Sequence, residues 1–268
     1  MSAGEKTKIC LTIAGLDPSG GAGVIADIKT FSAFGCYAAA AITSLTFQNT
    51  RGVFGAEHPS AEIVRRQIVP VFEDFDVDAV KTGMLPTEET ILTVAQLMTE
   101  NSVHNLVVDP VVRSTSGYDL IDDAALRSLI AELFPIATIV TPNIPEAERI
   151  TKMEIRGVDD VIDAAKVMRD LGARSVLIKG GHLEDLDNST DYLFIEGELA
   201  VLEAERIRTT STHGTGCTLS AAIAANLALG KSLVDAIKTA KHFVTEAIRT
   251  APNIGHGHSP INQLVKMD

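Results

Sequence analysis

Short runs of apolar and β-branched residues alternate along the chain with segments that have the periodicity of amphipathic helices. The runs over 8–14, 77–81, 106–109 and 175–179 contain few charged residues and are expected to be buried strands. Parallel strands need long connections, usually helices, and helices on both faces of a sheet make its strands apolar throughout. The alternation therefore predicts an α/β fold with a mostly parallel central sheet and helices on both faces.

Polar residues mark the expected starts of several helices. Ser60, Asp122 and Ser232 each precede a segment with apolar residues three or four positions apart, which is typical of an N-cap. The segments 191–195 and 199–202, separated by Glu-Gly-Glu, predict a β-hairpin. Strand and helix signals thus account for nearly all of the sequence.

Composition indicates a globular protein and argues against some partners. The 268 residues are 46% hydrophobic, and no linker, repeat or low-complexity segment interrupts them, which predicts a single domain over 1–268. A net charge of -12 argues against binding to nucleic acid or to an anionic membrane. No run has the roughly 18 apolar residues of a membrane span, and the start has no apolar leader. Three widely spaced cysteines, Cys10, Cys36 and Cys217, predict free thiols in a reducing cytoplasm.

A glycine-containing turn opens a helix late in the chain. The segment 212–217, Thr-His-Gly-Thr-Gly-Cys, runs into a stretch of small residues at 218–225. Gly214 and Gly216 permit a tight turn, and the helix adds unsatisfied amides and the positive end of its dipole, a combination that binds phosphate. In the first turn of a helix the pKa of the Cys217 thiol is expected to be lowered, favouring a thiolate. A phosphate site beside a reactive thiol predicts phosphoryl transfer.

Two other glycine-rich phosphate-binding designs fit the sequence poorly. A Walker A loop requires Gly-Lys-Ser/Thr after a strand, whereas Gly230-Lys231-Ser232 follows the end of a helix. A dinucleotide-binding fold requires an acidic residue at the end of the second strand, and 46–50 contains none. A late glycine loop that opens a helix remains.

The chain resembles the hydroxymethylpyrimidine/phosphomethylpyrimidine kinases of thiamin biosynthesis, of the ribokinase-like superfamily. The resemblance is carried by segments spread over nearly the whole sequence: 12–23, 26–30, 46–50, 78–85, 108–111, 141–147 and 212–222. It implies a ribokinase-like three-layer sandwich and a homodimeric kinase that uses ATP and Mg²⁺. The implied reactions are phosphorylation of 4-amino-5-hydroxymethyl-2-methylpyrimidine on its hydroxymethyl group, then of the monophosphate to the diphosphate.

The resemblance assigns phosphoryl transfer to the late glycine turn. The backbone of Gly214, Thr215, Gly216 and Cys217 would form an anion hole for the transferring phosphoryl group. Most superfamily members end this motif in an aspartate that acts as general base, whereas this chain has Cys217, as the pyrimidine kinases and some pyridoxal kinases do. We expect the Cys217 thiolate to take the hydroxyl proton or to orient the alcohol. A small buried cysteine that only fills space is the alternative.

Four further residues are implied at the nucleotide phosphates. Asn143 and Glu146 match an Asn-x-x-Glu element that organises Mg²⁺ and its waters, with Asp109 as a further candidate. A capping Asn with a first-turn Glu is the other interpretation of that pair. Lys179 resembles a residue near the phosphates, and a solvated lysine at a strand end is the alternative.

The pyrimidine site is also implied by the resemblance. The amide of Gln48 can donate and accept in one plane, which matches an aminopyrimidine edge. Asp27, Gly15, Met84 and Val111 are expected to line the same pocket, with Asp27 contacting the exocyclic amine or a ring nitrogen. Asp27 as an exposed helical residue and Met84 as a core residue are the alternatives.

Two other functions remain open on the sequence. A pyridoxal or pyridoxine kinase on the same scaffold phosphorylates a similar hydroxymethyl group but yields only a monophosphate. A non-catalytic pyrimidine-binding module is the second, although it need not keep Asn143, Glu146 and Cys217. The chain departs from many relatives at Ser211 and at Gln263, and the second change is expected to matter little. His213 is expected to be a structural hydrogen-bonding residue of the turn.

Overall fold

The computed structural model describes residues 6–112, 120–181 and 188–266. In this part of the chain, nine strands form one sheet in the order β3-β2-β1-β4-β5-β6-β7-β8-β9. The strands are β1 Ile9–Leu16, β2 Tyr37–Asn49, β3 Gly52–Glu57, β4 Ala79–Thr82, β5 Leu106–Val108, β6 Ile139–Val140, β7 Ser175–Lys179, β8 Asn188–Ile195 and β9 Glu198–Glu205.

The centre of the sheet is parallel and its margins are antiparallel. β1 pairs in parallel with both β2 and β4, and parallel pairing continues through β5, β6 and β7. β3 pairs antiparallel with β2 at one edge, and β8 and β9 form an antiparallel hairpin at the other. The predicted mostly parallel sheet is therefore confirmed.

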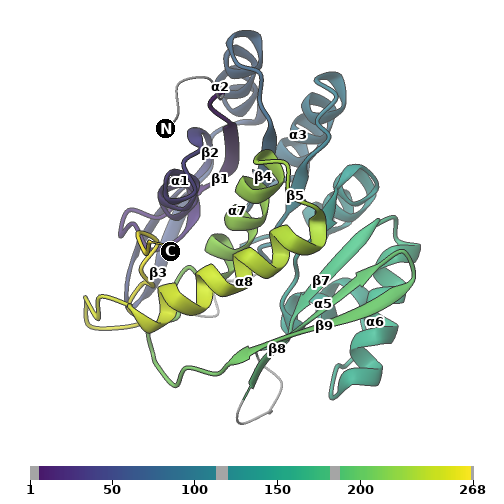
Figure 1. Ribbon diagram of the computed structural model, residues 1–268. Coiled ribbons are helices and arrows are strands. Elements are labelled where there is room, and N and C mark those ends of the chain that lie inside the picture. The colour runs from purple at the N-terminus through teal and green to yellow at the C-terminus, as the bar shows by residue number, and fades with distance from the viewer. Residues whose placement is uncertain (1–5, 113–119, 182–187, 267–268) are drawn as a thin grey trace.

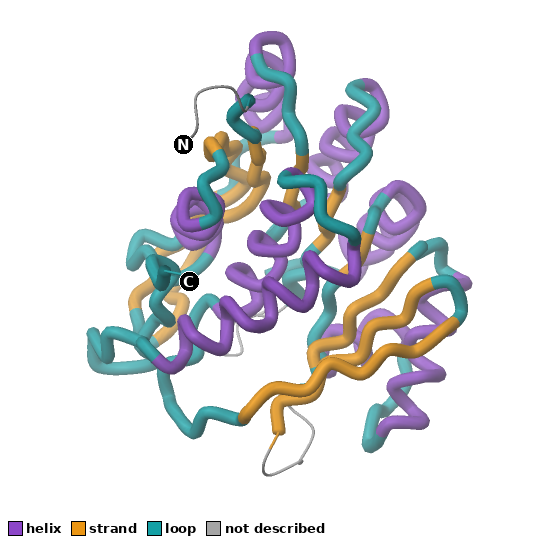
Figure 2. Tube along the Cα trace, in the orientation of Figure 1, coloured by secondary structure: helices purple, strands orange, loops and turns teal. Residues whose placement is uncertain are grey.

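Helices cover both faces of the sheet and make three layers (Figures 1 and 2). One layer contains α1 Gly23–Ala33, α7 Thr215–Ala228 and α8 Leu233–Arg249, and the other contains α2 Ala61–Asp74, α3 Glu88–Glu100, α4 Asp123–Ser128, α5 Ile144–Thr151 and α6 Val158–Asp170. Neighbouring strand residues point to opposite layers: Cys10 packs with the first layer, and Leu11 with the second. The ribokinase-like three-layer arrangement expected from the sequence is confirmed.

Local signals placed most elements correctly. The side chains of Ser60, Asp122 and Ser232 each accept a backbone N–H three residues on, as predicted for N-caps. The predicted hairpin is present and longer than expected. The edge strand β3 was missed, because Gly52 and Gly55 depress its strand signal.

Parallel pairing brings the carboxyl ends of six strands to one edge of the sheet. Asp17, Asp109 and Thr141 directly follow β1, β5 and β6. Gln48 is the second-last residue of β2, and Lys179 is the last residue of β7. The N-terminus of α7 reaches the same edge (Figure 1). This is where ligands bind in open α/β sheets.

The core positions predicted for Cys10 and Cys36 and the free thiols are confirmed. Cys10 and Cys36 are buried core residues, as expected, and all three cysteines are free thiols. Among the described residues, no helix combines the length and apolar character needed to cross a membrane.

Candidate active site

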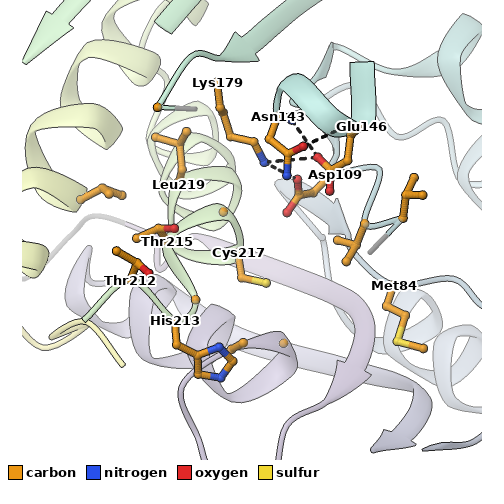
Figure 3. Close-up of a pocket in the computed structure, with 18 of the residues that line it drawn as sticks. Met84, Asp109, Asn143, Glu146, Lys179, Thr212, His213, Thr215, Cys217 and Leu219 are labelled. Atoms are coloured by element: carbon orange, nitrogen blue, oxygen red, sulfur yellow. Dashed lines mark hydrogen bonds and ion pairs between the residues drawn. The ribbon is translucent and has the colours of Figure 1, made fainter. Parts of the chain in front are cut away.

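A cavity of about 1000 Å³ lies at this edge of the sheet. It brings together all but one of the residues predicted for the site, namely Gly15, Gln48, Met84, Asp109, Val111, Asn143, Glu146, Lys179, Gly214, Thr215, Gly216 and Cys217. Figure 3 shows Thr215 and Cys217 at the start of α7, the cluster of Lys179, Asn143, Glu146 and Asp109, and Met84 apart from both. The glycine turn and Gln48, 160 or more residues apart in sequence, thus share one cleft.

The start of α7 has the geometry of an anion site. Gly214 is its N-cap with φ 85°, a conformation that favours glycine, and a Cβ there would collide with the carbonyl oxygen of Gly21. In the described part of the chain no side chain caps this helix; the N–H of Thr215 donates to the Thr212 carbonyl oxygen, and the next amides of the first turn, those of Gly216 and Cys217, remain available to a ligand. A Cβ on Gly216 would lie 3.2 Å from Lys179 Nζ and 3.9 Å from Asp109 Oδ2. The first turn of α7 therefore lies close to Lys179 and Asp109, and the glycine at 216 keeps the space beside the lysine free of a side chain.

Lys179 connects two buried carboxylates across the cavity. Its Nζ lies 3.0 Å from Asp109 Oδ1 and 3.9 Å from Glu146 Oε2 (Figure 3). Asp109 also accepts from Thr141 and Ser220. Burial alone would raise the pKa of Asp109, but the nearby Lys179 and Lys81 lower it below its ordinary value. Lys179 is thus a half-buried, ion-paired phosphate-site candidate and not a solvated strand-end residue.

Asn143 and Glu146 form a capping box at the start of α5. The Asn143 side chain accepts from the backbone N–H of Glu146, and Glu146 Oε2 accepts from the N–H of Asn143. Burial and the nearby Asp109 raise the pKa of Glu146 to about 7, although Lys179 opposes the shift. The capping interpretation is therefore correct, and Glu146 still lines the cavity.

The oxygen-rich face fits a hard cation only in part. Among the described residues no cluster of three or more His, Cys, Asp or Glu could hold a metal ion. Mg²⁺ retains several waters and commonly uses one or two carboxylates together with substrate phosphates. Glu146 and Asp109 meet that requirement, whereas they do not form a protein cage for the free ion.

Cys217 differs from the sequence prediction in its ionisation. Its side chain is half-buried, lines the cavity and accepts from the backbone N–H of Gly23. Burial raises the pKa of the thiol to about 11; Lys81 lowers it, and the carboxylates of Asp27 and Asp109 raise it further. The expected lowered pKa is therefore wrong, since burial and two nearby anions outweigh the helix N-terminus.

The two glycine-rich loops are joined by Asp17 and His213. The buried carboxylate of Asp17 accepts from the backbone N–H groups of Ser19, Gly21 and Ala22, and lies 2.8 Å from His213 Nε2. The structural role expected for His213 is confirmed, but sequence reasoning did not identify Asp17 as its partner. An Asp directly after a strand and before a glycine loop was the available signal.

Gln263 also joins these loops, contrary to expectation. Its side chain is buried, and Nε2 donates to the carbonyl oxygen of Gly21 at 2.9 Å. The departure at this position therefore supplies a contact beside the anion site. Ser211, the other departure, is buried and hydrogen-bonds Asn253.

Gln48 and Met84 lie at the end of the cavity remote from Lys179. Gln48 is half-buried on β2, and Met84 follows β4, where its carbonyl oxygen accepts from Thr43. A Cβ on Gly15 would lie 3.2 Å from Met84 Sδ, so glycine keeps this wall open. Val111, after β5, completes the wall. An amide among apolar groups suits a flat aromatic ring with polar edges.

Asp27 lies elsewhere than expected. It is fully buried on α1 and is not among the residues that line the cavity. Its Oδ2 lies 2.8 Å from Lys81 Nζ and 2.6 Å from Thr12 Oγ1. The predicted contact between Asp27 and the pyrimidine is thus not supported, because the carboxylate is paired with Lys81 in the core. The alternative, an exposed helical Asp27, is not supported either.

Sequence reasoning missed a third part of the cavity, on the side of α8. Lys241 Nζ and Asp191 Oδ2 form a buried pair 2.7 Å apart, and Val244 and Ile248 line the wall beside them. Val244 and Ile248 belong to the apolar stripe of α8 and gave no signal beyond core packing.

Comparisons with known proteins agree on one family. The sequence profile described as phosphomethylpyrimidine kinase matches residues 17–262. The thiamine biosynthesis bifunctional protein ThiED of Geobacter sulfurreducens is 47% identical over 95% of this chain, which spans 52% of that protein. The hydroxymethylpyrimidine/phosphomethylpyrimidine kinase of Rhizobium meliloti is 47% identical over 96% of this chain and 97% of its own length.

Solved structures include kinases for two kinds of substrate. The crystal structure of phosphomethylpyrimidine kinase from Clostridium difficile has 44% identity and a TM-score of 0.80, covering 90% of this chain and 100% of that one. Pyridoxal kinase from Staphylococcus aureus, in complex with AMP-PCP and pyridoxal, has 32% identity and a TM-score of 0.90, covering 97% and 94%.

Proposed function

Because the chain belongs to the phosphomethylpyrimidine kinase family, we propose that it transfers the γ-phosphoryl group of ATP to 4-amino-5-hydroxymethyl-2-methylpyrimidine, and then phosphorylates the monophosphate to the diphosphate. The observation that carries the proposal is the single cavity shared by Gln48 and the Gly214–Cys217 turn. One end suits an aminopyrimidine, and the other suits phosphate.

Lys179 and the first amides of α7 bind the phosphates in this proposal. The half-buried ammonium of Lys179 and the helix N-terminus face the same space, so both stabilise the charge on the equatorial oxygens of the transferring group. Mg²⁺, held by Glu146 with Asp109 and phosphate oxygens, would neutralise further phosphate charge. Local groups thus offset the repulsion of the chain's net charge of -12 for a polyanion.

Cys217 lies beside the acceptor hydroxyl in this arrangement. With a pKa of about 11 the thiol is mostly protonated at neutral pH, which favours the orienting role over proton abstraction. Transfer does not require prior deprotonation, because little bond to the attacking oxygen exists in a loose transition state. The hydroxyl oxygen bonds to the γ-phosphorus as the bond to the ADP oxygen breaks, and the hydroxyl proton passes late in the step to an oxygen of the transferred phosphoryl group.

Pyridoxal phosphorylation is the second candidate. It is supported by the likeness to a pyridoxal kinase that binds AMP-PCP and pyridoxal. Pyridoxal also presents a hydroxymethyl group on an aromatic nitrogen ring. A silent binding module is disfavoured, since the cavity keeps the phosphate-site residues as well as Gln48.

We also propose a homodimer that pairs through the β3 edge of the sheet. Leu45, Phe47 and Phe54 on β2 and β3 are 43%, 52% and 70% exposed, and β3 is an edge strand. Exposed apolar side chains on an edge strand are typical of a protein–protein contact. A second copy offers the same apolar surface, so a symmetric pair would cover both.

Product analysis tests the function. Purified protein is incubated with Mg-ATP and either the hydroxymethylpyrimidine or pyridoxal, and phosphates on the product are counted by mass spectrometry. Two phosphates on the pyrimidine are expected. A monophosphate of pyridoxal alone would favour the second candidate, and ATP left intact with both alcohols would contradict a kinase.

A further inference from the structure

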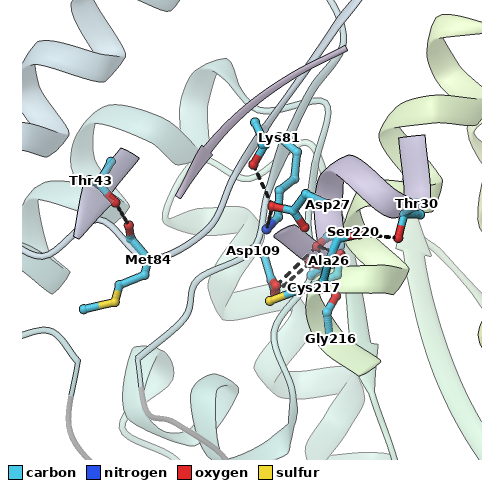
Figure 4. Close-up of polar contacts among 12 residues, drawn as sticks. Ala26, Asp27, Thr30, Thr43, Lys81, Met84, Asp109, Gly216, Cys217 and Ser220 are labelled. Carbon is cyan, nitrogen blue, oxygen red and sulfur yellow. Dashed lines mark hydrogen bonds and ion pairs between the residues drawn. The ribbon is translucent and has the colours of Figure 1, made fainter. Parts of the chain in front are cut away.

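A buried ion pair lies beneath the start of α7, outside the roles described so far. Lys81 on β4 and Asp27 on α1 are both fully buried, with Nζ 2.8 Å from Oδ2. Figure 4 shows the pair beside Asp109 and Cys217. Lys81 also borders the cavity, whereas Asp27 does not.

Core stability alone explains this pair poorly. Burying two charges costs free energy that their attraction does not always recover, and apolar residues of similar volume often serve as well. The second carboxylate oxygen, Asp27 Oδ1, is buried without a hydrogen-bond partner among the residues that the structure describes, which adds to that cost. A group that is expensive to bury and adjoins a reaction centre is a candidate for function.

The surroundings hold Lys81 in one place. Thr12 Oγ1 donates to the same Asp27 oxygen, fixing the carboxylate from the β1 side. At Gly83 a Cβ would lie 2.8 Å from Lys81 Nζ, so glycine leaves the space that the folded-back lysine occupies. Burial alone lowers the pKa of Lys81, but Asp27, Cys217 and Asp109 raise it well above its ordinary value, so the group is an ammonium ion.

We infer that Asp27 and Lys81 are positioning residues for Cys217: the carboxylate fixes the ammonium beside the thiol, and the ammonium holds the polarised sulfur where it orients the acceptor hydroxyl. This inference rests on the proposed place of Cys217 beside the acceptor hydroxyl. It gives Asp27 a role through Lys81 in place of a contact with substrate.

The charged groups that act on Cys217 come from four parts of the chain, and they have opposite signs. Lys81 lowers the pKa of the thiol, whereas Asp27 on α1 and Asp109 after β5 raise it, and the Gly23 amide lowers it. Lys179 on β7 also interacts with the thiol. Removing Lys81 and removing Asp27 must therefore move the thiol pKa in opposite directions.

The test measures the pKa of Cys217 without using activity. In a Cys10→Ala/Cys36→Ala background, the rate of alkylation by iodoacetamide is followed against pH. Asp27→Asn should lower the thiol pKa and speed alkylation at pH 9 about tenfold, and Lys81→Met should slow it by a similar factor. The matched control is the half-exposed pair of Lys8 and Asp78, 2.7 Å apart and remote from the cavity, where Lys8→Met and Asp78→Asn should leave the rate unchanged.

Lys81→Met leaves the Asp27 charge unpaired in the core, which destabilises the fold. A second variant without this unpaired charge is therefore needed. Lys81→Met/Asp27→Leu removes the whole pair, which folded proteins often tolerate. It should keep the fold, place the thiol pKa between the two single variants, and lower kcat about 10- to 100-fold with KM for the pyrimidine changed less than about threefold. Shifts of the same sign in the single variants, or no shift, would overturn the inference.

Turnover by the unsubstituted enzyme separates the two proposals. Opposite shifts in a protein that phosphorylates no alcohol would overturn the proposed function, and with it the role in transfer, while keeping the electrostatic link. Normal turnover with no shifts would overturn the inference and leave the function intact.

Discussion

Asp17 and His213 lie 2.8 Å apart, although 195 residues separate them along the chain, and they join the two loops that border the phosphate end of the cavity. Asp17 holds the backbone of the first glycine loop, and His213 belongs to the turn that opens α7. The Gly23 amide, at the end of the first loop, donates to Cys217 in the second. The position of the thiol therefore depends on how the loops are held together.

Replacing Asp17 should weaken both the fold and the transfer. Asp17→Asn removes the charge from a buried cluster of hydrogen bonds and should lower the free energy of unfolding by about 2 kcal/mol. We expect kcat to fall 10- to 100-fold because the anion site shifts relative to the acceptor. His213→Gln, which keeps a donor, should lose less activity than His213→Ala in the same assay. Equal losses in the two His213 variants would contradict a role for this hydrogen bond.

The stability effect of Asp17 should depend on pH in a defined direction. Burial alone raises the pKa of Asp17, but hydrogen bonds from His213 and Ser19 lower it below its ordinary value. A lowered pKa in the folded state gives stability that is present above the unfolded value of about 3.9 and is lost as pH falls through the folded value. The difference in unfolding free energy between the wild type and Asp17→Asn should be constant above about pH 5 and shrink below about pH 4. Urea denaturation across this range measures it.

In metal-free protein, the contribution of Glu146 to the free energy of unfolding should depend on pH in the opposite direction. Its pKa is raised to about 7, so the folded state binds a proton that the unfolded state has released above about pH 4.3. Wild-type stability should therefore fall as pH rises from about 5 to 8, by about 3 kcal/mol from this group. Glu146→Gln, which keeps the capping acceptor, should lack that fall when unfolding is measured in EDTA. The variant should also lose most of its activity with Mg-ATP. A parallel fall in both proteins would contradict the raised pKa.

Fold and site differ in how far sequence patterns predict them. The strands and N-caps follow from local periodicity, so the three layers were predictable, while the edge strand β3 was hidden by its glycines. The ends of parallel strands also placed Gln48, Asp109 and Lys179 near one another. The ionisation of Cys217 and the position of Asp27 were not predictable, because the burial of the thiol and the pairing of Asp27 with Lys81 arise only when α1 packs against β1 and α7 packs against β4.

Gly216 should tolerate a methyl group in the fold but not in the reaction. A Cβ there would lie 3.2 Å from Lys179 Nζ, in the space proposed for phosphate, and alanine favours a helix. Gly216→Ala should lower kcat/KM for ATP at least 100-fold and shift Tm by no more than about 2 °C. Gly157→Ala, where a Cβ meets no atom within 4 Å, is the matched control and should retain full activity. A Tm loss in Gly216→Ala well above about 2 °C would mean that the methyl group disturbs the fold. A loss of activity in Gly157→Ala as large as that in Gly216→Ala would also contradict this account.

The exposed aromatic residues of β2 and β3 should control self-association. Phe54→Glu places a charge on a side chain that is 70% exposed and should weaken the proposed dimer at least tenfold in sedimentation equilibrium. Leu264→Glu, at a residue that is 66% exposed near the C-terminus, is the control and should leave the dimer unchanged. A monomeric wild type at micromolar concentration would refute the proposed pairing.

Gln48 should decide which ring the cavity accepts. Its half-buried amide is the polar group on a wall otherwise formed by Met84, Val111 and Gly15, so a pyrimidine bound there loses its partner in Gln48→Leu. An unpaired polar edge in a buried site costs about 1–3 kcal/mol, which predicts a 10- to 100-fold fall in kcat/KM for the hydroxymethylpyrimidine. KM for ATP should remain within about twofold, because the glycine turn of α7 is unchanged. Gln96→Leu, at an exposed residue of α3, is the control for the change in polarity and should behave as the wild type. Equal losses for ATP and for the pyrimidine would mean that Gln48 supports the fold of the cavity and does not select the ring.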